Sequence, residues 1–184
     1  MKKNNLQKFK RFLFLRVWDL VASSKTTFKP HGIPITIPTH LDTSLRYSFA
    51  RNQPYEDAEA KMVMKNLLYG TNVIELGGCL GVISALIRDK IGPNAFHLIV
   101  EANPALIKIC SDNANTSGNS KNTKVVLAAV DYSLSKHVNF AQGDHVHQGR
   151  IYKEPKSVQT PTVTLSKLTH KMPKGPFALV CDIE

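Results

Sequence analysis

The spacing of hydrophobic positions predicts a helix at the start of the chain. Apolar residues recur at every third or fourth position over Lys2–Ala22, which is the period of a helix. They are Leu6, Phe9, Leu13, Val17 and Leu20. Six lysines and arginines and one acid lie among them, so the predicted helix is basic and amphipathic. Two interpretations stay open: the helix lies on an anionic membrane surface, or it caps or packs beside the rest of the protein.

After a proline-rich lead-in over residues 26–54, the pattern alternates between strands and helices. Ile33, Ile35 and Ile37 predict a short edge strand or hairpin arm within the lead-in. The predicted helices are Tyr55–Leu68, Gly81–Lys90 and Pro104–Asn115. The predicted strands are Asn72–Leu76, Phe96–Glu101, Lys124–Val130 and Phe177–Ile183, with weaker signals at Val138–Phe140 and Val158–Leu165. This alternation predicts an α/β fold, with a mostly parallel sheet, right-handed crossovers and helices on both faces.

Composition excludes several classes of protein. The chain has 184 residues, of which 42% are hydrophobic and 21% charged, as is usual for a globular domain. Its longest apolar runs fall far below the roughly 20 residues that a membrane-spanning helix needs. Three scattered cysteines are too few for a disulfide framework or a zinc site, so reduced thiols and a cytoplasmic location are expected.

The positive charge is concentrated at the N-terminus. The net charge is +10, of which residues 1–29 carry +7 and residues 30–184 carry +3. Residues 30–184 are nearly neutral and so lack the strong positive charge typical of proteins that bind nucleic acid. No nucleic-acid partner is therefore expected. The basic segment over residues 1–25 instead leaves a peripheral membrane contact open.

The strongest chemical signal is a glycine-rich turn after the strand Asn72–Leu76. Residues 73–81 have the sequence Val-Ile-Glu-Leu-Gly-Gly-Cys-Leu-Gly, with glycines at 77, 78 and 81. The dinucleotide pattern G-x-G-x-x-G fails here at its second glycine. The pattern E-x-G-x-x-x-G instead resembles the usual first motif of S-adenosylmethionine enzymes. The acid Glu75 suits the ammonium of that ligand and would repel a pyrophosphate.

Further acids end the later strands. Glu101 follows Gly81 by twenty residues, at a place where a carboxylate can accept hydrogen bonds from ribose hydroxyls. Asn103 is expected to cap the next helix. Asp182 and Glu184 lie at the rim where ligand and substrate meet in open α/β sheets, and their spacing puts them on one side of the strand.

Two weaker candidates lie in the second half of the chain. Asp131 follows the strand Lys124–Val130, where such folds often contact the adenine amino group; a solvated turn residue is the alternative. His145 and His147 are two positions apart, but no third ligand is placed by spacing. We therefore expect no metal site.

Taken in order, these motifs resemble those of the FkbM-family methyltransferases, which are class I S-adenosylmethionine-dependent enzymes. The matching segments are residues 73–81, 100–104, 113–118, 163–166 and 180–184, with the pair Tyr55-Glu56 upstream. The chain departs from the family at Glu75 (usually Asp), at Gly78-Cys79 (usually Ala-Asn) and at Ala102 (usually Pro). The resemblance implies a Rossmann-like class I methyltransferase domain over residues 55–184, incomplete at its C-terminus after the fourth core strand.

The resemblance also implies an activity and a site. The expected reaction is transfer of the sulfonium methyl of S-adenosyl-L-methionine to a hydroxyl of a sugar or another small polar metabolite. Asp182 and Glu184 are expected beside the methyl and the acceptor, as base or positioning group. The implied cofactor contacts are Glu75, Gly77, Gly78, Cys79, Gly81, Glu101, Ala102, Asn103 and Asp131.

Two other functions stay open. A non-catalytic nucleotide-binding or peripheral membrane module is one, because Cys79 departs from the family and the N-terminal helix is basic. An NAD-dependent dehydrogenase is the other, although the failed glycine pattern disfavours it. The expected location is the cytoplasm, with contact at the inner membrane face if the basic helix binds lipid.

Overall fold

The computed structural model describes residues 2–22, 24, 26–41, 43–118, 120–142, 149–151 and 157–183. The predicted site residue Glu184 lies outside these described residues, and so do His145 and His147.

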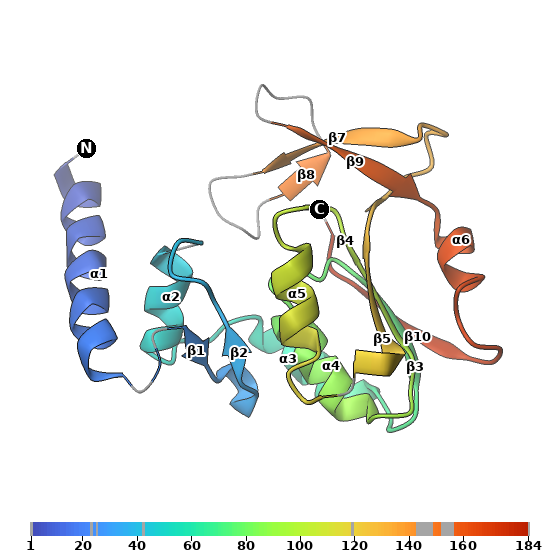
Figure 1. The fold of residues 1–184 in the computed structure, drawn as a ribbon, viewed down its shortest axis with the longest axis horizontal. Helices are drawn as coiled ribbons and strands as arrows, with labels where there is room; N and C mark the ends of the chain where they lie inside the picture. The colour runs from blue at the N-terminus through green and yellow to red at the C-terminus, as the bar shows by residue number, and fades with distance from the viewer. Residues whose placement is uncertain are drawn as a thin grey trace.

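A four-stranded parallel sheet forms the centre of the fold (Figure 1). Its strands are β3 (Asn72–Leu76), β4 (His97–Glu101), β5 (Thr123–Leu127) and β10 (Phe177–Cys181), in the spatial order β10-β3-β4-β5. The chain runs outward from β3 to β4 and β5, and then returns to pair β10 with the other side of β3. Successive strands are therefore added on one side of β3 up to β5, and β10 is added on the opposite side of β3; we call the place between β3 and β10 the reversal point.

Helices cover both faces of this sheet, and the α/β prediction is confirmed. Val73 and Ile99 face one side, where α3 (Asp57–Asn66), α4 (Val82–Ile91) and α5 (Ile107–Ala114) pack. Ile74 and Leu98 face the other side, where α6 (Leu165–Thr169) inserts Leu168. The central strands β3 and β4 are buried on both faces, which explains why they are mainly apolar in sequence, while the edge strands β5 and β10 are only partly buried.

A second, mixed sheet stands beside the first, with the order β6-β9-β7-β8. Its strands are β6 (Ala129–Val130), β7 (His137–Gln142), β8 (Gly149–Ile151) and β9 (Val158–Val163). The two weaker strand signals therefore mark real strands, β7 and β9. The prediction of one strand over Lys124–Val130 was wrong, because β4 ends at Glu101 and the chain beyond Ala128 pairs with β9 instead.

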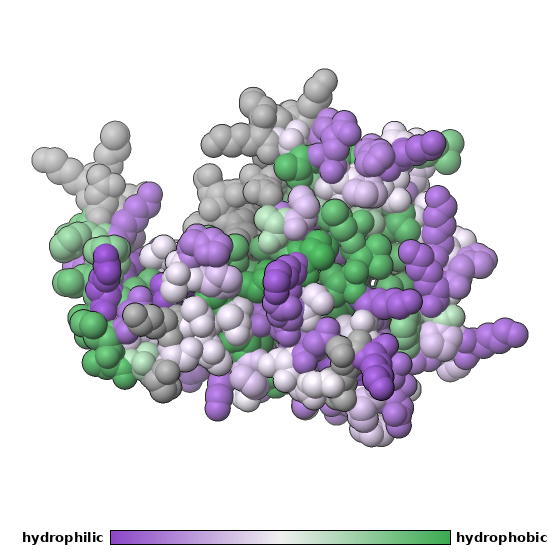
Figure 2. Space-filling view, in the orientation of Figure 1, coloured by the Kyte–Doolittle hydropathy of each residue, from purple (hydrophilic) through white to green (hydrophobic). Residues whose placement is uncertain are grey.

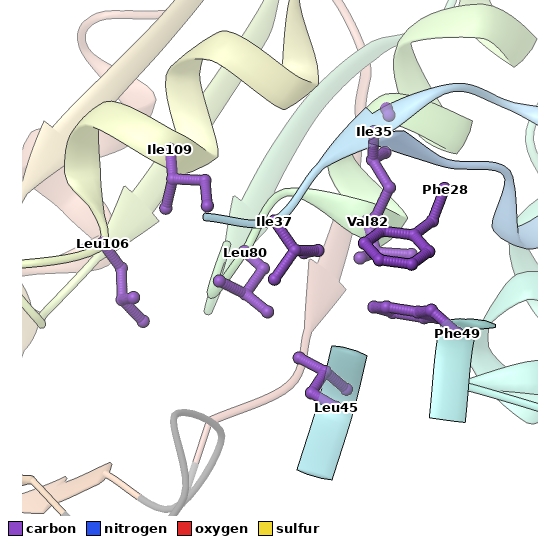
Figure 3. Packing of buried hydrophobic residues seen from close by; sticks show 10 residues of the cluster. Phe28, Ile35, Ile37, Leu45, Phe49, Leu80, Val82, Leu106 and Ile109 are labelled. Atoms are coloured by element: carbon purple, nitrogen blue, oxygen red, sulfur yellow. The ribbon is translucent and has the colours of Figure 1, made fainter. Parts of the chain in front are cut away.

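The lead-in packs against the glycine-rich turn and the helices beside it (Figure 3). A hairpin of β1 (Thr27–Phe28) and β2 (Ile35–Thr36), with the 3-10 turn Pro30–Gly32 between its strands, precedes α2 (Thr43–Ala50). The hydrophobic pattern did not predict α2. Apolar side chains of these elements surround Leu80 of the turn; they are Phe28, Ile35, Ile37, Leu45 and Phe49.

A buried amide joins the lead-in to the turn. The Asn113 side chain on α5 donates to the carbonyls of Thr36 (3.0 Å) and Leu80 (2.7 Å), and it accepts from the amide of Thr36 (2.7 Å). Three buried hydrogen bonds at one side chain fix the position of the turn relative to β2 and α5.

The N-terminal helix α1 (Lys2–Val21) confirms the first predicted element almost to the residue. It lies at the edge of the molecule beside α2 (Figure 1). Across the described residues, no helix is long and apolar enough to span a membrane.

Candidate functional site

A cavity of about 570 Å³ lies where β3 and β10 end. The glycine-rich turn lines it at one end, and the segment from Ala178 of β10 to Asp182 and one face of α3 as far as Asn66 line it along their length. Its size is typical of small-molecule sites, which enclose about 300–1,000 Å³. The cavity also lies where the direction of strand addition reverses, and open α/β sheets bind their ligands at that point.

Gly77 brings the turn into direct contact with the end of β10. Its φ is +92°, and a Cβ at this position would lie 2.0 Å from the backbone carbonyl oxygen of Asp182. The amide of Asp182 donates to the carbonyl of Leu76 (2.9 Å), while the amides of Gly77 and Gly78 donate to the carbonyl of Val100 (2.9 and 3.2 Å). Only glycine suits position 77, because both the backbone conformation and the close approach exclude a side chain.

The next two glycines allow close helix packing. A Cβ at Gly78 would lie 2.5 Å from the Ile99 side chain and 2.7 Å from the Cys110 sulfur. Gly81 has a φ of +77°, and a Cβ there would lie 2.7 Å from the carbonyl oxygen of Cys110. These glycines therefore hold the start of α4 against β4 and α5.

The Glu101 carboxylate clamps the turn from the side of β4. It is buried, and its two oxygens accept from the amides of Cys79 (2.7 Å) and Asn103 (2.6 Å). Burial raises the pKa of Glu101, and the amides that it accepts from oppose that shift. The amide of Ala102 also bonds this carboxylate, so about one of the roughly four acceptor positions of a carboxylate remains for a ligand.

Cys79 completes the turn in a left-handed conformation, with φ +44°. Burial, followed by the nearby Glu101 carboxylate, raises the pKa of the Cys79 thiol to about 12. The thiol is therefore protonated at neutral pH and is a poor nucleophile. Its contribution to the cavity wall is a weakly polar surface rather than a reactive group.

Glu75 lies at the inner wall of the cavity and belongs to a buried polar network. One carboxylate oxygen accepts from the Ser84 hydroxyl (2.9 Å), and the other lies 2.8 Å from Nε2 of His97. Sequence analysis did not find Ser84 or His97. The sequence feature that could have indicated them is a polar residue in an otherwise apolar element: His97 at the buried start of β4, and Ser84 on the buried face of α4.

Glu56 and Tyr55 form the wall of the cavity opposite Asp182. Burial is the largest cause that raises the pKa of Glu56 to about 7, and the nearby carboxylate of Asp182 adds to it. Burial is the largest cause that raises the pKa of the Tyr55 hydroxyl, and the neighbouring Glu56 carboxylate adds to it. The sequence match included this pair but assigned it no role.

The structure separates the predicted site residues into two groups. The cavity brings together Glu75, Gly77, Gly78, Cys79 and Asp182. Glu101, Ala102, Asn103 and Gly81 do not line it, although the bond from Cys79 to Glu101 connects the two groups.

Two of the remaining predicted residues are held by local contacts. The Ala102 carbonyl accepts from the Thr160 hydroxyl (2.8 Å), so β9 supports the segment after β4. Asp131 follows β6 and accepts from the amide of Ser133 (3.1 Å), away from the cavity lining. The described part of the chain holds no group of three His, Cys, Asp or Glu side chains placed to bind a metal ion.

The fold and site define an α/β protein with a ligand cavity at the reversal point of a parallel sheet. No family model matches the chain, and no curated protein matches it. The chain is similar to a solved structure of a protein-L-isoaspartate O-methyltransferase, at 20% identity and a TM-score of 0.37. The match covers 64% of this chain and 41% of that one, so this chain spans less than half of the solved protein. We draw nothing about activity from a likeness at that TM-score.

Proposed function

We propose that the chain is an S-adenosylmethionine-dependent methyltransferase domain that acts on a hydroxyl of a small, polar, carbohydrate-like acceptor. The observation that carries the proposal is the cavity at the reversal point, which is lined by the glycine-rich turn, by Glu56 and by Asp182. The ordered resemblance of residues 73–81, 100–104 and 180–184 to the FkbM family supports the same class.

The residues around the turn fit this cofactor. Glu101 has about one acceptor position left for a ribose hydroxyl. Gly77 lets the turn meet the end of β10 directly, which holds together two of the segments that line the cavity. Glu75 places a buried carboxylate beside the cavity, which suits the ammonium of the methionine part. When bound, the cofactor would supply a sulfonium methyl group: the acceptor oxygen would attack the methyl carbon in line, and the sulfur would leave with the electron pair of the broken C–S bond, as S-adenosylhomocysteine.

In this proposal, the first contribution of the protein is to hold the cofactor and the acceptor in the orientation that the transfer needs. Glu101 holds the Cys79 amide, so the turn keeps its shape without a ligand and less ordering is needed on binding. Holding two reactants in line accounts for much of the rate enhancement in such transfers.

The acids of the cavity handle the acceptor proton in this proposal. With its pKa at about 7, Glu56 exists in both protonation states near neutral pH, as a general base requires. A carboxylate oxygen of Glu56 takes the proton of the acceptor hydroxyl, and Asp182 orients that hydroxyl from the opposite wall. This assigns to Glu56 a role that the sequence predicted for Asp182 and Glu184 alone.

Isothermal calorimetry with S-adenosylhomocysteine, with NAD titrated in parallel, tests the cofactor class. We expect a dissociation constant on the order of micromolar for S-adenosylhomocysteine, because a carboxylate that pairs with a ribose hydroxyl contributes about tenfold or more in affinity. We expect no heat from NAD, because the Glu75 carboxylate beside the cavity would repel its pyrophosphate. Binding of NAD alone would indicate the dehydrogenase. No binding of either by a sample that unfolds cooperatively would indicate a non-catalytic module.

The raised pKa of Glu56 predicts a pH-dependent stability. A carboxyl that holds its proton longer in the folded state stabilises the fold below its ordinary pKa of 4.5, and this stabilisation is lost as the pH rises to about 7. We expect about 1–3 kcal/mol of the free energy of unfolding to disappear over that range. Glu56→Gln should flatten the slope in urea unfolding measured across it.

The raised pKa of Glu101 changes the pH dependence of the free energy of unfolding equally in the parent and in Glu56→Gln. The difference between the two slopes therefore reports Glu56 alone. Asp89→Asn, which removes an exposed carboxylate from α4, is the control and should keep the parent slope. Equal slopes for parent and Glu56→Gln would contradict the pKa assigned to Glu56.

A further inference from the structure

One face of α1 attaches the helix to α2 and sets its rotation. Leu15 is buried on this face, with 4% of its surface exposed. The Asp19 carboxylate pairs with the Arg46 guanidinium at 2.8 Å, and the Phe14 ring meets the Tyr47 ring edge-on at 5.1 Å between centroids. An ion pair, a buried leucine and an aromatic contact on successive turns leave the helix little freedom to rotate.

The opposite face of α1 is apolar and exposed. We call its five residues the apolar stripe; between 54% and 84% of the surface of each is exposed. They are Leu6, Phe9, Leu13, Val17 and Leu20. Figure 2 shows hydrophobic surface along the outer edge of the molecule, where α1 lies. The stripe that the periodicity predicted is therefore not the face that packs on the protein.

Positive charge flanks the apolar stripe. Lys10 is exposed at one edge of it and Arg16 at the other, where the Arg16 guanidinium lies 5.2 Å from the Phe12 ring centroid; Lys8 is exposed farther round the helix, on the side of Leu15. Asp19 is the one acid in the sequence of α1, and its ion pair with Arg46 neutralises it. The exposed part of the helix thus combines large apolar side chains with cations that no neighbouring acid of the helix offsets.

We propose that α1 docks the protein on an anionic lipid surface, with the apolar stripe at the level of the headgroups and Lys10 and Arg16, at its two edges, facing lipid phosphates or carboxylates. Phe and Leu on one face, flanked by Lys and Arg, are the composition of helices that lie in a membrane interface. Charge selects this occupant over a second copy of the chain, since two such helices would bring like charges together. The proposal rests on α1 and is independent of the activity proposed above.

Co-sedimentation of the full chain with vesicles tests it. We expect binding to phosphatidylcholine vesicles that contain phosphatidylserine, weak binding to phosphatidylcholine alone, and a decrease as salt is added. The double variant Leu13→Ser, Leu20→Ser should lower the partition coefficient at least about tenfold, because both side chains leave water on binding. Lys10→Gln and Arg16→Gln should each lower it about fivefold on the anionic vesicles.

A matched control separates the apolar stripe from general surface hydrophobicity. Leu68 and Leu134 are exposed to 72% and 97% and lie outside α1, so Leu68→Ser, Leu134→Ser should bind vesicles like the parent. All four leucines are exposed, so the thermal midpoints of both double variants should match that of the parent. Equal vesicle binding by the two double variants would overturn the proposal. So would a lipid-free dimer that only Leu13→Ser, Leu20→Ser disrupts, because the stripe would then be a protein interface.

Discussion

Replacing Gly77 with alanine should lower the free energy of unfolding by about 2–5 kcal/mol and abolish ligand binding in the cavity. A left-handed backbone costs a non-glycine residue about 1–2 kcal/mol. The added Cβ would also meet the Asp182 carbonyl oxygen at 2.0 Å, a backbone atom that cannot rotate away. The turn must therefore separate from the end of β10, and these are the two segments that bound the cavity.

Two other glycines provide the control for backbone strain alone. Gly70 and Gly118 have φ values of +84° and +78°, and nothing lies within 4 Å of a Cβ at either position. Gly70→Ala and Gly118→Ala should each lower the free energy of unfolding by about 1–2 kcal/mol, which is the strain of a left-handed backbone at a residue with a side chain. Chemical denaturation of all three variants measures the difference. A Gly77→Ala protein no less stable than the two controls would show that the turn and β10 are not in contact.

Substituting Glu101 with alanine should weaken S-adenosylhomocysteine binding by about 1–3 kcal/mol, which is about 5- to 150-fold in the dissociation constant. It should also lower the free energy of unfolding by about 2–4 kcal/mol, because the amides of Cys79 and Asn103 lose their acceptor. Glu101→Gln restores one acceptor but places a donor against the other amide, so we expect an intermediate loss of stability.

Calorimetry and urea unfolding on the same samples distinguish the two effects. Asp112→Asn is the control, since Asp112 is an exposed carboxylate on α5 that pairs only with exposed Lys108 at 2.6 Å. It should change neither quantity measurably. Unchanged affinity in a stably folded Glu101 variant would remove the ribose assignment and leave Glu101 as a structural clamp.

The parallel sheet was predictable because its central strands β3 and β4 are buried on both faces and are therefore mainly apolar. The limits of β3 at Asn72 and Leu76 match the prediction. The helices were predicted less accurately at their ends. Glu56 adopts a left-handed conformation, so α3 begins at Asp57 rather than Tyr55, and α5 begins at Ile107 rather than Pro104. Backbone conformation at single residues decides such ends, and periodicity does not report it.

Part of the candidate site was predictable for a related reason. Glycines and acids at the carboxyl ends of parallel strands fall on one edge of the sheet whatever the rest of the chain does. The sequence therefore indicated Gly77, Glu101 and Asp182. It did not indicate that Glu101 would accept a hydrogen bond from the Cys79 amide in the turn, or that Glu56 would lie near Asp182, because these contacts join segments far apart in the chain.

By itself, the sequence determined the order of elements, the glycine-rich turn and the amphipathic character of α1, since each depends on residue type and local spacing. Only the tertiary structure decided which face of α1 is exposed. Periodicity shows that Leu13 and Leu20 share a face, but Leu15 and the Asp19–Arg46 pair attach the opposite face to α2. Tertiary structure likewise decided the pKa of Glu56 and the placement of Asp182 against Gly77. Burial and contacts between distant segments set these properties, and no local pattern encodes them.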